Sequence, residues 1–174
     1  METTNRTNTI ISGDIPVIPS GGQVPRGALL NAIDLLVNEH YAVKQLLTQL
    51  PTTTGSERVR LLEEIKNALI VHNASEENVI YPAIKDLADR PQHAQTLYHQ
   101  QDEAQVVVWE LPQLIADDDQ FVEKAEKLRD AILAHVRQEE EHEFPRLQEL
   151  PADAQARLNA DMTKFRATFG KAGV

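Results

Sequence analysis

The strongest constraint on the fold is a stripe of apolar residues that recurs at alternating spacings of four and three in three segments. This alternation places the members of a stripe on one face of an α-helix, and it is typical of the core-facing side of a helix in a bundle. The three stripes are Leu29, Ile33, Leu36, His40, Val43, Leu47 and Leu50; Leu62, Ile65, Leu69, His72, Glu76, Val79 and Ala83; and Phe121, Ala125, Leu128, Ile132, His135, Glu139 and His142. Each stripe is interrupted partway along by polar side chains.

Turn signals divide the chain into four long helical stretches and a shorter last one. Pro51 and Gly55 separate the first two stretches, Pro91 begins the third, and an aspartate run at 117–119 introduces the fourth. The predicted helices span about 28–50, 56–88, 91–116, 117–150 and 152–168. Because short connections favour antiparallel neighbours, we predict an all-α fold. It is an antiparallel up-down-up-down four-helix bundle with an extended N-terminal arm and a short C-terminal helix.

The expected domain organisation follows from these stretches. Residues 1–26 carry three prolines and the Gly21-Gly22 pair without sustained periodicity, so they are interpreted as an extended or disordered arm. Residues 27–150 form the bundle, and residues 151–174 form a C-terminal helix and tail. A chain of 174 residues is long enough for one such domain with its own core.

Charge and composition exclude several classes of function. The formal net charge of −10 repels nucleic-acid phosphates and anionic lipids, so neither nucleic acid nor membrane is expected as a partner. The sequence contains no cysteine, which removes disulfides, thiolate nucleophiles and iron–sulfur clusters. The N-terminus has no basic region followed by an apolar run, and a cytoplasmic protein is the default expectation.

The polar interruptions of the stripes predict a metal site. Three stretches carry a histidine and a glutamate four residues apart, which stacks both side chains on one helix face. Because unpaired buried carboxylates and imidazoles are costly, a cation that binds them all explains their place in the core. The pairs are His72 and Glu76, His99 and Glu103, and His135 and Glu139, and His40 adds a histidine from the first stretch.

An internal repeat supports this interpretation. In one copy, His72 and Glu76 precede Tyr81 and Pro82. In the other, His135 and Glu139 precede the dipeptide 144–145, Phe-Pro, at the same offsets. Two helix pairs related by pseudo-symmetry are a usual arrangement of metal sites in bundles. Each proline should kink the helix or end its regularity just past the site.

These motifs together resemble the hemerythrin-like, or HHE cation-binding, family over about residues 28–150. The resemblance rests on the Glu39-His40 pair and on three strings: HNASEENVIYP, HQQDE and HVRQEEEHEFP. It implies two non-haem iron ions joined by an oxo or hydroxo bridge, with Glu76 and Glu139 as bridging carboxylates. His40 and His72 then serve one iron, and His99, Glu103 and His135 serve the other. Glu103 departs from oxygen-carrying hemerythrins, which have a second histidine there, and this argues against reversible dioxygen carriage.

Two classes of function remain open on the sequence. The first is a redox-active di-iron protein that binds or reduces dioxygen, peroxide or nitric oxide, with an enzymatic oxidase or peroxidase activity as one form of it. The second is a non-enzymatic module for oxygen or iron sensing or storage. A ferritin-like site needs two Glu-x-x-His motifs and only residues 139–142 fit, while a zinc hydrolase of the His-Glu-x-x-His type has no match.

A few further residues are assigned mainly to packing or to the surface. Lys44 and His142 are candidates for tuning the site. The three tyrosines and the tryptophan are interpreted mainly as packing residues, with a redox role for a tyrosine beside the iron as the alternative. They are Tyr41, Tyr81, Tyr98 and Trp109.

Overall fold

The computed structural model describes residues 31–115 and 118–169, and within these ranges every regular element is helical. The predicted arm at 1–26 and the last five residues of the tail lie outside them. The elements are α1 (Ala32–Gln49), η1 (Leu50–Thr52), α2 (Gly55–Ser75), η2 (Glu76–Ile80), α3 (Tyr81–Asp86), α4 (Pro91–Glu110), η3 (Leu111–Leu114), α5 (Asp118–Gln138), η4 (Glu139–Glu143), α6 (Phe144–Gln148) and α7 (Ala152–Phe169).

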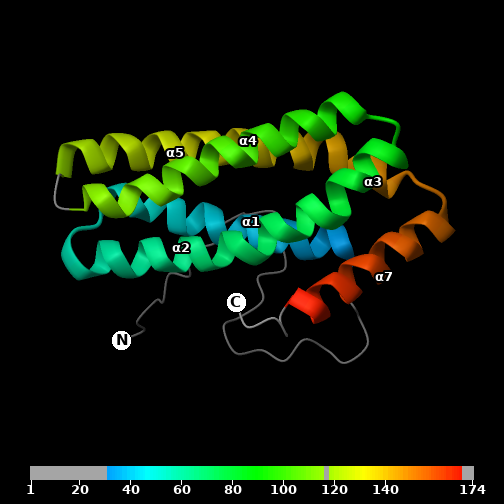
Figure 1. The fold of residues 1–174 in the computed structure, drawn as a ribbon, viewed down its shortest axis with the longest axis horizontal. Helices are drawn as coiled ribbons and strands as arrows, with labels where there is room; N and C mark the ends of the chain where they lie inside the picture. The colour runs from blue at the N-terminus through cyan, green and yellow to red at the C-terminus, as the bar shows by residue number, and fades with distance from the viewer. Residues whose placement is uncertain (1–30, 116–117, 170–174) are drawn as a thin grey trace, which may run out of the picture.

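The elements form the predicted antiparallel four-helix bundle (Figure 1). One pair of helices is α1 with α2 and its continuation α3, and the other is α4 with α5 and its continuation α6. The last helix, α7, lies across one end of the bundle against α1 and α2. In the described residues, no helix is long and apolar enough to cross a bilayer.

The helix ends follow local sequence chemistry. The side chain of Asn31 caps α1 by accepting a hydrogen bond of 2.9 Å from the amide of Asp34. Gly55 begins α2 with φ at +57°, a conformation that is favourable for glycine because it has no Cβ. Pro91 occupies the start of α4, where its missing N–H costs no helical hydrogen bond.

The predicted stripes form the core. Of their members in the described residues, all are buried except Leu69, which is half-buried, and His142, which is exposed. The apolar members fall into two clusters. One lies at the α3, α6 and α7 end around Tyr81 and Phe144, and the other lies at the opposite end around Leu47 and Phe121. The polar interruptions lie along the stripes between these two clusters.

Helices α2 and α5 each pass into a π-helical turn at the repeated glutamates, Glu76 and Glu139. In η2 the amide of Tyr81 donates to the carbonyl of Glu76, and in η4 the amide of Phe144 donates to that of Glu139. The prolines that follow, at 82 and 145, would clash with the carbonyl four residues earlier in a regular α-helix, and a wider turn makes room. The irregularity therefore begins at the glutamates of the site itself, whereas the prolines predict it just past the site.

Candidate metal centre

Five of the seven predicted ligands converge in the middle of the bundle. His40 comes from α1, His72 from α2, Glu76 from η2, His135 from α5 and Glu139 from η4, and all five are buried. Their ligand atoms form two sets, each within 4.8 Å: His40, His72 and Glu76, and Glu76, His135 and Glu139. The two sets share Glu76, whose carboxylate has two oxygens and can therefore contact two neighbouring ions.

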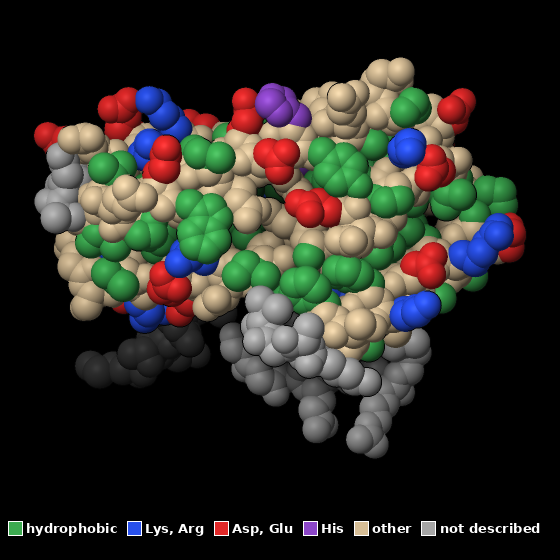
Figure 2. Space-filling model, in the orientation of Figure 1, with side chains coloured by type: hydrophobic (Ala, Val, Ile, Leu, Met, Phe, Trp, Pro, Cys, Tyr) green, Lys and Arg blue, Asp and Glu red, His purple; other side chains and the backbone are tan. Residues whose placement is uncertain are grey.

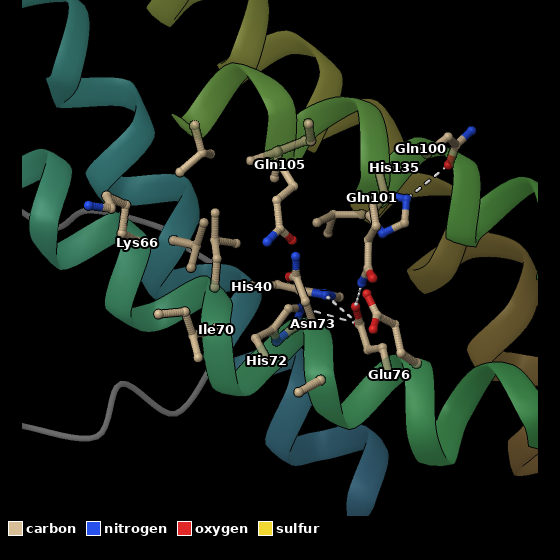
Figure 3. Close-up of a pocket in the computed structure, with 18 of the residues that line it drawn as sticks. His40, Lys66, Ile70, His72, Asn73, Glu76, Gln100, Gln101, Gln105 and His135 are labelled. Atoms are coloured by element: carbon tan, nitrogen blue, oxygen red, sulfur yellow. Dashed lines mark hydrogen bonds and ion pairs between the residues drawn. The ribbon is translucent and has the colours of Figure 1, made fainter. Parts of the chain in front are cut away.

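The three imidazoles present the same nitrogen to the two carboxylates. His72 Nε2 lies 3.1 Å from Glu76 Oε1, and His135 Nε2 lies 3.4 Å from Glu139 Oε1. His40 Nε2 lies between the two carboxylates, 3.5 Å from Glu76 Oε1 and 3.3 Å from Glu139 Oε2. In Figure 3, His40 and His72 approach Glu76 from neighbouring helices.

The other ring nitrogen of two histidines contacts an outer carboxylate. His40 Nδ1 lies 2.9 Å from Glu140 Oε1, and Lys44 Nζ holds the same carboxylate at 3.0 Å. His72 Nδ1 lies 3.0 Å from Glu39 Oε2. A carboxylate can only accept here, so each Nδ1 carries the proton and donates it. When the imidazole is neutral, its Nε2 lone pair is left facing the centre.

Gln100 and Arg166 complete this outer layer. His135 Nδ1 donates to Gln100 Oε1 at 2.9 Å, and the amide of Gln100 in turn donates to Gln138. Glu39 accepts a bidentate pair of hydrogen bonds from Arg166 of α7 at 2.7 and 2.8 Å. All three histidines are thus oriented by a partner outside the cluster, a common feature of metal-ligating histidines.

Several buried polar atoms in the cluster have no hydrogen-bond partner within the described residues. They are His40 Nε2, Glu76 Oε1, Glu139 Oε2 and Gln101 Oε1. Each such group costs roughly 1–3 kcal/mol when it stays unsatisfied. A cation between them would satisfy imidazole nitrogen and carboxylate oxygen together, so this donor set fits a first-row metal.

Without a metal, protons take over part of this role. Burial lowers the pKa of His40, but the carboxylates of Glu139, Glu140 and Glu76 outweigh burial and raise it to about 11. Burial also lowers the pKa of His72, and Glu76 and Glu39 outweigh it and raise the pKa to about 9. Both imidazoles therefore hold protons at neutral pH that an incoming metal ion must displace.

The carboxylates shift in the opposite direction. Burial alone would raise the pKa of Glu76, but the charge of His72 and the contact with His40 bring it far below its ordinary value. The pKa values of Glu39 and Glu140 are lowered as well, because their histidine and basic partners outweigh burial. All three carboxylates are thus held in the ionised form, in which Glu76 can bind a metal and Glu39 and Glu140 can accept hydrogen bonds from the histidines.

The prediction that His99 and Glu103 join the cluster is wrong. Their side chains are 73% and 68% exposed and pair with each other at 3.4 Å on the outer face of α4. The face of α4 that enters the core carries Ala94, Leu97, Gln101 and Val108 instead. The histidine-glutamate pair on this helix is therefore an ordinary surface contact between residues four apart.

Gln101 was missed, although the sequence held a signal for it. Positions 94, 97, 101, 104, 108 and 111 repeat the same alternation of three and four, and this stripe passes through Gln101 and not through His99. The buried amide of Gln101 donates to Glu76 Oε2 (Figure 3). Of the tuning candidates, Lys44 reaches the site through Glu140, whereas His142 is exposed.

The hydroxyl of Tyr81, a residue that the sequence assigns mainly to packing, lies inside the cluster. Tyr81 Oη is 3.0 Å from Glu139 Oε1 and 3.2 Å from both Glu76 Oε2 and His135 Nε2. Its ring is fully buried. Burial and the two carboxylates raise the pKa of this phenol well above its ordinary value.

A cavity of about 230 Å³ connects the cluster to the face on which α2 and α4 lie. Its inner end is formed by His40, His72, Glu76 and His135. Both apolar side chains such as Leu69 and polar ones such as Gln105 line the rest, and Figure 3 labels several of the polar ones. The exposed Trp109, whose ring lies 5.3 Å from Lys66 Nζ, also borders it. Figure 2 shows a small hollow near the middle of this face with acidic side chains beside it. A cavity of this volume admits a small molecule.

Comparisons with known proteins agree with this geometry. The family model described as the hemerythrin HHE cation-binding domain matches residues 31–147, a range that contains the whole cluster. One curated relative is a protein from Nostoc sp. (strain PCC 7120) named DNA nickase, which is 25% identical over 143 residues. That alignment covers 82% of this chain but only 40% of the relative. No solved structure matches.

Proposed function

Because the chain belongs to the hemerythrin HHE cation-binding domain family, we propose that its buried cluster binds two iron ions and reacts with dioxygen, peroxide or nitric oxide. The observation that carries the proposal is the pair of donor sets that share Glu76. The unpartnered atoms of His40, Glu76 and Glu139 support it, since they lie where a cation would satisfy them.

The proposed assignment divides the ligands between two ions. His40, His72 and Glu76 hold one ion, and Glu76, His135 and Glu139 hold the other. Nitrogen and oxygen donors without sulfur suit non-haem iron, and an oxo or hydroxo bridge would complete the pair. Iron, when bound, supplies the one-electron and oxygen chemistry that no side chain provides.

The remaining parts of the protein prepare this site. The outer partners Glu140, Glu39 and Gln100 orient the three imidazoles. The mainly apolar lining of the cavity limits bulk water, while the opening between α2 and α4 gives a small ligand a path to Glu76 and His135. These features favour a small neutral molecule, such as a diatomic gas or hydrogen peroxide, as the ligand.

Metal analysis and absorption spectroscopy test the proposal together. Protein expressed with ample iron is expected to contain two iron ions per chain and to change its absorption spectrum when the reduced form meets oxygen. One ion or none per chain, or a spectrum that does not respond to oxygen, peroxide or nitric oxide, would rule out the proposal. Rapid oxidation indicates a redox enzyme, whereas a stable and reversible adduct indicates a sensor or carrier.

A sensing role is the second candidate, and one observation favours it. Arg166 on α7 holds Glu39, and Glu39 holds His72, so the C-terminal helix is tied to the metal ligands. A change in the position of His72 would therefore reach α7. A difference in hydrogen exchange of α7 between reduced and oxidised protein would support sensing, and identical exchange would oppose it.

DNA nicking is not part of the proposal. The name DNA nickase belongs to a relative of which this chain covers 40%. The net charge of −10 here disfavours a phosphate-rich substrate.

A further inference from the structure

Apart from Glu76, Tyr81 is the one polar residue of η2 and α3 whose side chain enters the cluster. We propose that Tyr81 is a metal ligand, binding the ion held by Glu76, His135 and Glu139 through its phenolate oxygen. This inference rests on the proposed function, because it adds a fourth protein ligand to one of the two proposed ions.

The distances around Tyr81 Oη are those between ligands of one ion. Glu139 Oε1 is 3.0 Å away, and Glu76 Oε2 and His135 Nε2 are each 3.2 Å away. First-row ions bind nitrogen and oxygen at about 2.0–2.2 Å, which puts neighbouring ligands in tetrahedral or octahedral geometry at roughly 2.8–3.6 Å. The separation of 3.4 Å between His135 Nε2 and Glu139 Oε1 falls in the same range.

Hydrogen bonds alone do not satisfy the atoms around Tyr81 Oη, because there are more acceptors than protons. The phenol has one proton, but three atoms within hydrogen-bond distance compete for it. His135 Nδ1 already donates to Gln100, which turns Nε2 toward the phenol as a further acceptor. Gln101 supplies a second N–H, to Glu76 Oε2. The Nε2 atoms of His40 and His72 lie beside the other oxygens of the two carboxylates, Glu76 Oε1 and Glu139 Oε2. A single cation satisfies all of these acceptors.

The second ion also lacks a ligand that the first one has. On α1, His40 is the buried residue that faces both carboxylates, whereas the corresponding core position of α4 is Gln101. His99, the histidine predicted to fill this role, lies on the surface. The oxygen of Tyr81 supplies a donor on the side of the cluster where the histidine is missing.

The internal repeat contains its own comparison. Phe144 has the same offset from Glu139 that Tyr81 has from Glu76. The Phe144 ring stacks on His40, with centroids 5.8 Å apart and an angle of 6° between the planes. A phenyl ring is therefore accommodated at this point of the repeat, and only the Tyr81 copy adds an oxygen that reaches the ligands.

Binding in this way requires the loss of one proton. The phenol O–H bond breaks, the proton leaves to solvent, and the oxygen keeps both electrons of that bond and donates a pair to the ion. Without the ion, the neighbouring carboxylates oppose this ionisation. A multivalent cation in their midst reverses the local electrostatics and favours the anion.

Ferric phenolates absorb visible light through ligand-to-metal charge transfer, which gives a direct test. Full-length protein is loaded with ferrous iron without oxygen, oxidised in air, and examined by absorption and resonance Raman spectroscopy. We expect a broad visible band whose excitation enhances tyrosinate ring vibrations. Tyr81→Phe should lose the band and these vibrations, and Phe144 indicates that the variant will fold.

Tyr98→Phe is the matched control. The Tyr98 ring lies 4.8 Å from that of Tyr81, but its hydroxyl donates to the backbone carbonyl of Glu77, away from the cluster. This variant should keep the band. Iron-loaded wild type without tyrosinate vibrations, or with vibrations that survive Tyr81→Phe, would overturn the ligation and leave the di-iron proposal intact. Failure to bind iron would overturn both. Raman of the wild type decides the matter even if Tyr81→Phe binds less iron.

Discussion

At the scale of single residues, the centre is organised by partners that never touch the proposed ions. Glu39 shows this best, because it accepts from His72 on one side and from both terminal nitrogens of Arg166 on the other. Its carboxylate thereby fixes the proton of His72 at Nδ1 and directs Nε2 toward Glu76. Orientation of this kind lowers the entropy that a ligand loses when it binds a metal.

Removing the Glu39 carboxylate should therefore weaken metal binding without removing a ligand. We expect Glu39→Ala to lower metal affinity about 10–100-fold, the usual effect of losing an outer partner of a ligating histidine. Titration with a competing chelator measures this. The control is Glu123→Ala, since Glu123 is an exposed residue of α5 paired with Lys127. Equal affinities of the two variants would show that Glu39 has no part in binding.

At the scale of elements, the sequence predicted most of the fold and identified five residues that the structure brings together in the cluster. The stripes of α1, α2 and α5 could be followed because long apolar side chains mark them on both sides of each polar residue. The stripe of α4 is harder to see, because Ala94, Gln101 and Ala104 are small or polar. The predicted ligands on α4 were His99 and Glu103, which lie two residues before and after the buried Gln101 and on the outer face of the helix. Packing against α3 and α5 places the weakly marked face of α4, with Gln101, in the core.

The orientation of α4 leads to a prediction that separates the two faces. His99→Ala and Glu103→Ala should retain full metal content and change the free energy of unfolding by no more than about 0.5 kcal/mol, as is usual for exposed residues. His135→Ala should lose metal, because His135 Nε2 is a donor in the second set. Metal analysis of the three purified variants, with denaturant unfolding, measures both quantities. Loss of metal in His99→Ala would mean that α4 is rotated about its axis and that His99 faces the core.

At the scale of the whole molecule, the centre divides the core into two apolar clusters that do not depend on it for their packing. One contains Ile84, Leu97 and Met162, and the other contains Leu47, Ile65 and Leu128. Each cluster joins several helices, so the bundle should keep its helices when metal is removed. Metal removal lowers the free energy of unfolding, because the buried polar groups between the clusters lose the cation that compensates them.

Metal should therefore stabilise a protein that folds without it. An ion present at a hundred times its Kd contributes about 2.7 kcal/mol, which raises Tm by roughly 5–10 °C for a domain of this size. Far-ultraviolet circular dichroism of the chelated protein should remain largely helical. Thermal melts of the metal-loaded and chelated forms measure the difference, and equal Tm values would show that the cluster does not bind metal in the native state.

The difference in Tm between metal-loaded and chelated protein should increase with pH. In the metal-free form, the pKa values of His40 and His72 are raised to about 11 and about 9, so their imidazolium–carboxylate pairs stabilise the fold fully below pH 6.5. That stabilisation is lost as pH rises through 9 and then 11, because the folded state must give up protons that the unfolded state has already lost. Metal affinity rises over the same pH range, since fewer protons compete for the imidazole nitrogens. The Tm gap between loaded and chelated protein should therefore widen from pH 6.5 to pH 9. A gap that narrows over this interval would show that protons and metal do not compete for His40 and His72.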